Sequence, residues 1–90
     1  MKVKVLGGLS VEHDGEPIIV SGAMQLGVFF RLAVDAGVAV SYREIVEDVW
    51  GLDAPDNERA ALQSVISRLR SQLPAGVIES TAGGYRLAID

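Results

Sequence analysis

The residues best suited to bind a ligand gather in one segment, Arg59–Leu73. They are three arginines, three serines and a glutamine, with no acid among them: Arg59, Gln63, Ser64, Ser67, Arg68, Arg70 and Ser71. Guanidinium groups pair with phosphates and with the edge of guanine, and hydroxyl and amide groups form hydrogen bonds with other base edges. Taken alone, this surface either binds nucleic acid or is a helix side whose arginines are simply solvated.

The periodicity of the same segment predicts an amphipathic helix that ends near Leu73. Its apolar residues recur at helical spacing and form one stripe: Leu62, Val65, Ile66, Leu69 and Leu73. Asp56 is the expected N-cap of this helix. Pro74 stops it, because proline lacks the backbone N–H that a further turn needs. Such a helix buries its stripe and presents the arginines and serines to solvent.

A glycine-rich hairpin is expected directly after this helix. Strands are predicted at 77–80 and 85–89, joined by Thr81-Ala82-Gly83-Gly84, where glycines accommodate positive φ. Arg86 lies in the second strand and either reaches a phosphate or is simply exposed. A helix followed by such a hairpin is the arrangement with which a winged helix-turn-helix meets DNA.

Three short strands are expected before any helix, at 2–6, 9–13 and 17–20. Residues 2–6 alternate as in a half-buried strand, Gly7-Gly8 is a break, and Asp14-Gly15 is a turn signal. These segments predict a small antiparallel sheet at the start of the chain.

Two further helices are expected between this sheet and Arg59. The first covers about 23–36 and ends at Gly37, and a short strand at 38–40 is expected to join the sheet. The second begins with a capping box, in which Ser41 caps the helix and Glu44 reaches back to it. This second helix ends near Trp50 and turns three apolar residues inward: Ile45, Val46 and Val49.

The composition indicates one small α+β domain of 90 residues, 49% of them hydrophobic. Its expected parts are a sheet at 1–20, three helices within 23–73 and a hairpin at 77–89. The absence of cysteine excludes disulfides and thiolate metal sites, and His13 has no second histidine, so no cofactor is expected. The most apolar stretch, 23–40, contains Arg31 and Asp35, which a bilayer would penalise. A cytoplasmic protein fits these features.

The charges are unevenly distributed along the chain. The net charge of -4 argues mildly against nucleic acid, because non-specific affinity depends on basic side chains that replace phosphate counterions. However, the acids form a block without a base, and the arginines from Arg59 onward meet no acid before Glu79. The acids have no nucleophile, metal-binding set or phosphate loop nearby, so we expect a solvated helix surface and no enzyme. The acidic block consists of Glu44, Glu47, Asp48, Asp53, Asp56 and Glu58.

Five pieces of the sequence occur in the order and spacing of a known family and together cover nearly the whole chain. They are Val5-Leu6-Gly7-Gly8-Leu9 with Asp14-Gly15, Ala36-Gly37 before Val40-Ser41, Trp50-Gly51 with Pro55, Leu62-Gln63-Ser64 running into Val65-Ile66-Ser67-Arg68-Leu69-Arg70, and Gly83-Gly84-Tyr85-Arg86-Leu87. The chain resembles the winged helix DNA-binding domain of the OmpR/PhoB type. It is most similar to the branch at the N-terminus of SARP-type regulators, which control antibiotic pathways in actinobacteria.

The resemblance implies that a four-stranded N-terminal sheet packs on three helices, with the third helix in the major groove and the hairpin wing at the minor groove. It also implies head-to-tail binding of protomers to direct repeats in double-stranded DNA. The 51–57 loop corresponds to the one associated with RNA polymerase. Position by position, Ser64, Ser67 and Arg68 correspond to groove-facing residues, and Arg59 and Arg70 to backbone contacts.

Two departures from the family pattern keep a second hypothesis open. The first helix opens with the uncharged residues 23–26 where a basic segment is usual, and Thr81 stands where the wing commonly has an arginine. Thr81 is therefore the wing residue expected to approach the DNA, with Glu79 nearby. Together with the acidic block, these departures motivate the alternative of a degenerate winged helix that acts as a protein–protein interaction module.

Overall fold

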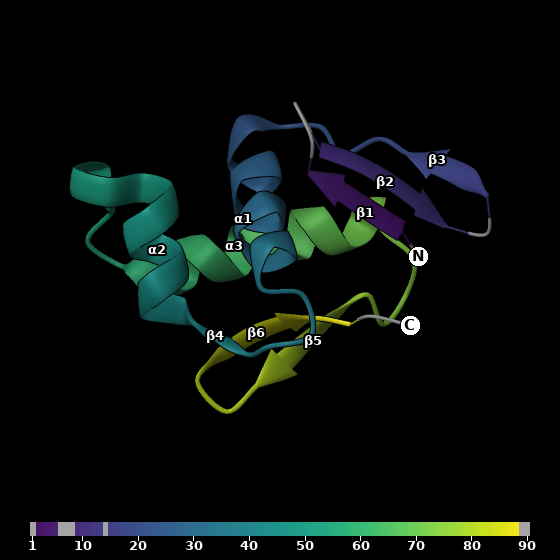
Figure 1. Cartoon of the computed structure of the whole chain (residues 1–90). Coiled ribbons are helices and arrows are strands. Elements are labelled where there is room, and N and C mark those ends of the chain that lie inside the picture. The colour runs from purple at the N-terminus through teal and green to yellow at the C-terminus, as the bar shows by residue number, and fades with distance from the viewer. Residues whose placement is uncertain (1, 6–8, 14, 89–90) are drawn as a thin grey trace.

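The computed structural model describes residues 2–5, 9–13 and 15–88, which form three α-helices and two small sheets (Figure 1). In chain order the elements are β1 (Lys2–Val5), β2 (Leu9–His13), β3 (Glu16–Ile18), α1 (Ala23–Val34), β4 (Val40–Ser41), α2 (Tyr42–Trp50), a 3-10 turn η1 (Gly51–Asp53), α3 (Glu58–Gln72), β5 (Ile78–Thr81) and β6 (Gly84–Leu87). This order confirms the expected succession of elements and the α+β class.

The three helices enclose the hydrophobic core. Figure 1 shows α1 crossing α3, with α2 beside the first part of α3. The expected apolar stripe of α3 is buried along its whole length, which fixes the opposite side of α3 toward solvent. Fully buried side chains come from all three helices: Val28, Phe29, Leu32, Ile45, Val46, Leu62, Ile66 and Leu69.

The helix caps confirm one sequence prediction and correct another. The Ser41 hydroxyl accepts a hydrogen bond from the Glu44 backbone N–H at 3.1 Å, as expected for the start of α2. The cap of α3 is Asn57, whose side-chain oxygen accepts from the Ala60 N–H at 3.1 Å, so the assignment of Asp56 is wrong by one residue. The reason is geometric, because a capping oxygen must reach the N–H of the third helical residue.

The N-terminal sheet is antiparallel with strand order β1-β2-β3 and pairs Val3 with Val11 and Val11 with Ile18. Its third strand starts one residue earlier than expected and ends at Ile18. Gly15 has a φ of 79°, in keeping with the expected turn. The predicted roles of Leu6, Gly7-Gly8, Asp14 and Ile89 lie outside the described residues, as does the side chain of His13.

The link from this sheet to α1 is attached to the far end of α3. The Gln72 side chain accepts a hydrogen bond from the Ser21 N–H at 2.6 Å and donates one to the Ser21 carbonyl oxygen at 3.1 Å. These two bonds satisfy a backbone donor and an acceptor that no strand or helix pairs. They join segments that lie 51 residues apart in the chain.

The fourth strand does not join the N-terminal sheet, which corrects the prediction from sequence and from the resemblance. β4 pairs with β6, so the second sheet has the order β4-β6-β5, with Val40 opposite Tyr85 and Ser41 opposite Gly84. In the described part of the chain, the N-terminal sheet therefore has three strands. The change of direction occurs at Gly37, which has a φ of 85° and donates its N–H to the Leu87 carbonyl oxygen at 2.9 Å.

The wing hairpin turns more tightly than the sequence suggested. β5 continues through Thr81 and β6 begins at Gly84, so Ala82-Gly83 alone forms the turn. Positive φ, the expected reason for the glycines, does not occur at Gly83 or Gly84. Gly84 is required by close approach instead, because a Cβ there would overlap the Val40 carbonyl oxygen and lie 2.8 Å from the Ser41 Cα.

Candidate nucleic-acid interface

The outer side of α3 presents a row of polar side chains opposite the buried stripe. Gln63, Ser64, Ser67 and Arg68 are all exposed, at positions that share this side of the helix. The Ser71 hydroxyl also lies on the exposed surface but donates a hydrogen bond to the Arg68 carbonyl oxygen at 2.6 Å. These side chains are therefore accessible to a large binding partner along the exposed side of α3.

A hollow lies between this row, the start of α2 and the wing. Its volume is about 190 Å³. The fold brings together three residues singled out from the sequence, Arg59, Gln63 and Thr81, which all line the hollow. Tyr42 and Ser80 line it too. Sequence reasoning missed these last two, because only the packing of α2 and the wing against α3 places them near Arg59.

The Arg59 side chain is positioned by an aromatic ring. Its guanidinium carbon lies 5.0 Å from the centroid of the Tyr42 ring, within the range of a cation–π contact. Arg59 is otherwise exposed, so the stack restricts the side chain without neutralising its charge. The arrangement offers a positive group at the mouth of the hollow.

Arg70, for which the resemblance implied a contact to the DNA backbone, packs against the wing. Its guanidinium donates to the Ile78 carbonyl oxygen at 2.9 and 3.3 Å and to the Ser80 hydroxyl at 3.0 Å. The guanidinium carbon also lies 5.8 Å from the centroid of the Tyr85 ring. These contacts commit Arg70 to the junction between α3 and the wing.

Arg86 lies on the other side of the wing. It is directly opposite Glu79 in the strand register and pairs with that carboxylate at 2.9 and 3.1 Å. Because side chains alternate along a strand, this pair points away from the side that carries Ser80 and Tyr85. The structure therefore does not bring Arg86 together with the residues of the hollow, and its charge is balanced.

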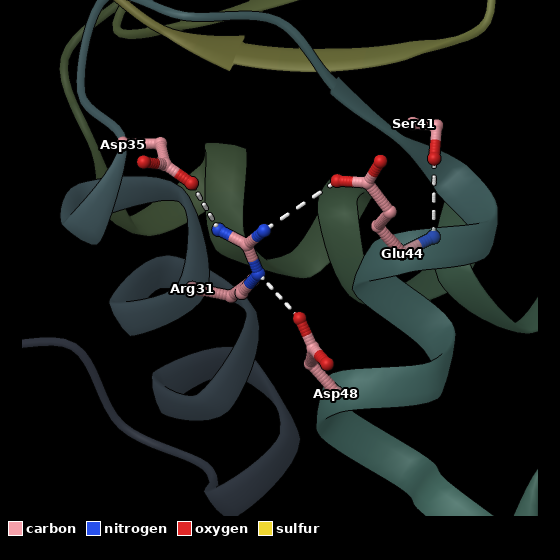
Figure 2. A network of polar contacts seen from close by, with 5 residues as sticks. All are labelled: Arg31, Asp35, Ser41, Glu44 and Asp48. Carbon is pink, nitrogen blue, oxygen red and sulfur yellow. Dashed lines mark hydrogen bonds and ion pairs between the residues drawn. The ribbon is translucent and has the colours of Figure 1, made fainter.

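Two acidic residues of α2, Glu44 and Asp48, are turned toward Arg31 of α1 (Figure 2). Arg31 contacts Asp48 at 2.6 Å, Asp35 at 2.8 Å and Glu44 at 3.5 Å. The hydrogen bonds that Arg31 donates to Asp35 and, second, to Asp48 raise the pKa of its guanidinium, which stays charged. The Glu44 carboxylate thus faces Arg31, and the expected return contact to the start of α2 does not occur among the described hydrogen bonds.

Two positive side chains of the interface, Arg59 and Arg68, have no carboxylate partner within the described ranges of the chain. Glu79 is the one acid between Arg59 and Leu87, and Arg86 neutralises it.

The described residues contain no group of three or more side chains that could hold a metal ion. None of the described helices is long and apolar enough to cross a membrane. Because Arg59 and Arg68 are not neutralised by a carboxylate of the described residues, the exposed side of α3 can bind an anionic polymer.

A three-helix core with a hairpin beside an exposed polar helix defines a winged helix-turn-helix protein. Residues 18–87 match the family described as "Transcriptional regulatory protein, C terminal". The chain belongs to this family, the OmpR/PhoB-type DNA-binding domains of transcriptional regulators, and its relatives are SARP-family proteins. The fold and the family predicted from sequence are thereby confirmed.

Curated relatives are much longer than this chain. The transcriptional regulator RedD of Streptomyces coelicolor is 35% identical over 100 residues, a match that covers 100% of this chain and 28% of RedD. The regulatory protein AfsR of the same organism is 31% identical over 85 residues, which covers 94% of this chain and 9% of AfsR. The chain therefore spans less than a third of either relative.

Two solved structures share the architecture. EmbR of Mycobacterium tuberculosis, in complex with a low affinity phosphopeptide, superposes with a TM-score of 0.84 and 28% identity, covering 98% of this chain and 25% of that one. The DNA binding domain of CpxR from E. coli gives a TM-score of 0.67 and 24% identity, covering 88% of this chain and 81% of that one. The second likeness shows a shared fold.

Proposed function

We propose that this chain binds double-stranded DNA in a sequence-specific manner as part of a bacterial transcriptional regulator. The observation that carries the proposal is the outer surface of α3, where Gln63, Ser64, Ser67 and Arg68 are exposed beside Arg59, and neither arginine has a carboxylate partner among the described residues. Membership of a DNA-binding family supports it and disfavours the alternative of a module that binds protein only. The family is typically non-enzymatic, and the absence of an enzymatic activity stays a prediction.

In the proposed complex α3 enters the major groove and the wing lies beside the minor groove. Arg68 reads a base edge, with Ser64 and Ser67 beside it, and Arg59 contacts a phosphate from the mouth of the hollow. Thr81 lines the same hollow and approaches the backbone from the wing. Phosphate contacts set the position of the protein, and base contacts set its sequence preference.

Four finer proposals follow, of which the first two rest on the resemblance. Protomers bind direct repeats head to tail, and the exposed 51–57 loop is available to RNA polymerase. The protein acts in the cytoplasm, where a bacterial chromosome is reached without crossing a membrane. Residues 1–90 act as one winged helix domain.

A salt titration tests the proposal directly. Binding to a mixed-sequence DNA duplex should be detectable at about 50 mM salt. The logarithm of the binding constant should fall linearly with the logarithm of the salt concentration, because each phosphate contact releases a counterion. Selection of bound duplexes from a pool of random DNA sequences should then enrich a motif that occurs as a direct repeat. The absence of binding at low salt, in protein shown to be folded, would contradict the proposal.

A further inference from the structure

An apolar groove lies between α1 and α2 and is separate from the interface described above. Its floor and walls are apolar side chains of α1 together with Val49 of α2, and its volume is about 360 Å³. Three residues spaced four apart along α1 expose large apolar surface beside it: Leu26 at 40%, Phe30 at 45% and Val34 at 58%. Apolar side chains clustered in this way on a small protein mark an interaction site.

The position of the groove keeps it accessible when α3 is occupied. α1 packs toward α3 through Val28, Phe29 and Leu32, which are fully buried. Phe30 and Val34 lie on the opposite side of α1, because positions one to two residues away from a buried stripe rotate toward solvent. A ligand in the groove and a duplex against α3 therefore contact opposite sides of the helical core.

The rim of the groove is acidic. Arg31 and Asp48 both line it, and Figure 2 shows Arg31 surrounded by Asp35, Glu44 and Asp48. The Arg31 side chain is only 19% exposed, whereas the three carboxylate side chains are 48%, 61% and 56% exposed. The base is thus largely covered while the acids face solvent, so the rim presents negative charge to an approaching partner.

The apolar floor and the acidic rim of the groove indicate what kind of partner it binds. A second copy of this chain would bring the same acidic rim against itself, and like charges at close range repel. A helix with an apolar stripe and flanking lysines or arginines satisfies both the floor and the rim. The exposed stripe from Leu26 to Val34 spans nine residues, about 12 Å of helix, which matches two to three turns of a partner.

We propose that the α1–α2 groove binds a basic amphipathic helix of a partner protein. The inference does not rest on the proposed DNA binding. It also differs from the alternative considered from the sequence, since the groove adds a protein contact without replacing the α3 surface.

The probe for this proposal is a synthetic peptide of about 18 residues with leucines at helical spacing and lysines elsewhere, long enough to form a helix. The matched control replaces every lysine with glutamate. Each peptide is titrated into the isotope-labelled chain and followed by NMR. The lysine peptide should shift the resonances of Phe30, Val34 and Val49, and the glutamate peptide should not. Phe30→Gln or Val34→Gln should weaken binding at least tenfold, and Leu52→Gln, at a fully exposed leucine outside the groove, should leave it unchanged.

Circular dichroism and DNA binding of each variant serve as controls for folding and for the separate interface. Equal binding of the glutamate peptide, resonance shifts that map elsewhere, or folded groove variants that bind the lysine peptide normally would each overturn the proposal. A concentration-dependent dimer in sedimentation that Phe30→Gln abolishes would also overturn it, in favour of a second copy as the occupant.

Discussion

Arg70 on α3 and Ile78 on β5 join the helix to the wing: the guanidinium donates to the Ile78 carbonyl oxygen at 2.9 and 3.3 Å. The same group donates to the Ser80 hydroxyl and lies over the Tyr85 ring. A planar group with several donors in a fixed fork suits this task, which a single ammonium cannot perform. Arg70 therefore sets the position of the wing relative to α3.

Arg70→Ala should weaken DNA binding about tenfold without changing its salt dependence. The reason is that the variant misplaces the wing and loses the hydrogen bonds to the part-buried Ile78 carbonyl oxygen and to the exposed Ser80 hydroxyl, at a cost of about 1–2 kcal/mol in unfolding free energy. A direct phosphate contact would behave differently, because its loss lowers the salt slope by about one. Fluorescence anisotropy over a salt series, with thermal unfolding in parallel, separates the two. A reduced slope with unchanged stability would show that Arg70 contacts DNA.

Arg68→Ala should cost about 1–3 kcal/mol of binding free energy at one base pair of the operator. Arg68→Lys is the matched variant, since it keeps the charge but loses the bidentate geometry that reads guanine. We expect the lysine variant to retain affinity for mixed DNA and to lose discrimination at that position. Binding to a panel of singly substituted operators measures this. An equal loss of affinity for every operator in the panel would show that Arg68 contacts a phosphate instead of a base.

Gly84→Ala should destabilise the fold by about 1–3 kcal/mol, because the added Cβ overlaps the Val40 carbonyl oxygen and forces β4 and β6 apart. Gly83→Ala provides the control, since a Cβ at that position meets no atom within 4 Å and the backbone φ is not positive. We expect Gly83→Ala to remain within about 0.5 kcal/mol of the parent chain. Urea unfolding of both variants compares them, and similar losses would contradict the packing argument.

Asn57→Ala should lower the unfolding free energy by about 1 kcal/mol, since it removes the cap of α3. For a domain of this size, such a loss corresponds to a decrease of about 4–8 °C in Tm. Asp56→Ala should change stability by less than about 0.5 kcal/mol, because Asp56 is exposed and provides no capping bond. Calorimetry of the two variants decides which residue begins the helix.

Arg31→Gln should destabilise the α1–α2 contact by about 1–2 kcal/mol, because three carboxylates then face one another without a base. Added salt screens that repulsion, so the variant should recover stability with salt more than the parent chain does. Arg43→Gln, at an exposed arginine of α2, is the control. Thermal unfolding at low and high salt measures the difference. Equal salt responses of the two variants would exclude the network as a source of stability.

The sequence by itself determined the features that depend on near neighbours. The stripe of α3, the cap at Ser41, the three helices and the wing hairpin all follow from residues a few positions apart, because helical periodicity and capping are local. The exposure of Gln63, Ser64, Ser67 and Arg68 follows in turn, since one buried side of a helix dictates the other. The candidate interface on α3 could therefore be predicted before the structure was known.

The tertiary structure alone decided which distant groups meet. Val40 pairs with Tyr85 across 45 residues of sequence, so β4 extends the wing and makes Gly84 indispensable for packing. The tertiary structure also brings the Arg70 guanidinium to the Ile78 carbonyl oxygen of the wing and places Arg86 against Glu79 on the far side. The short runs of residues around these positions hold no signal for such pairings, because strand partners and guanidinium acceptors are chosen by how the whole core packs.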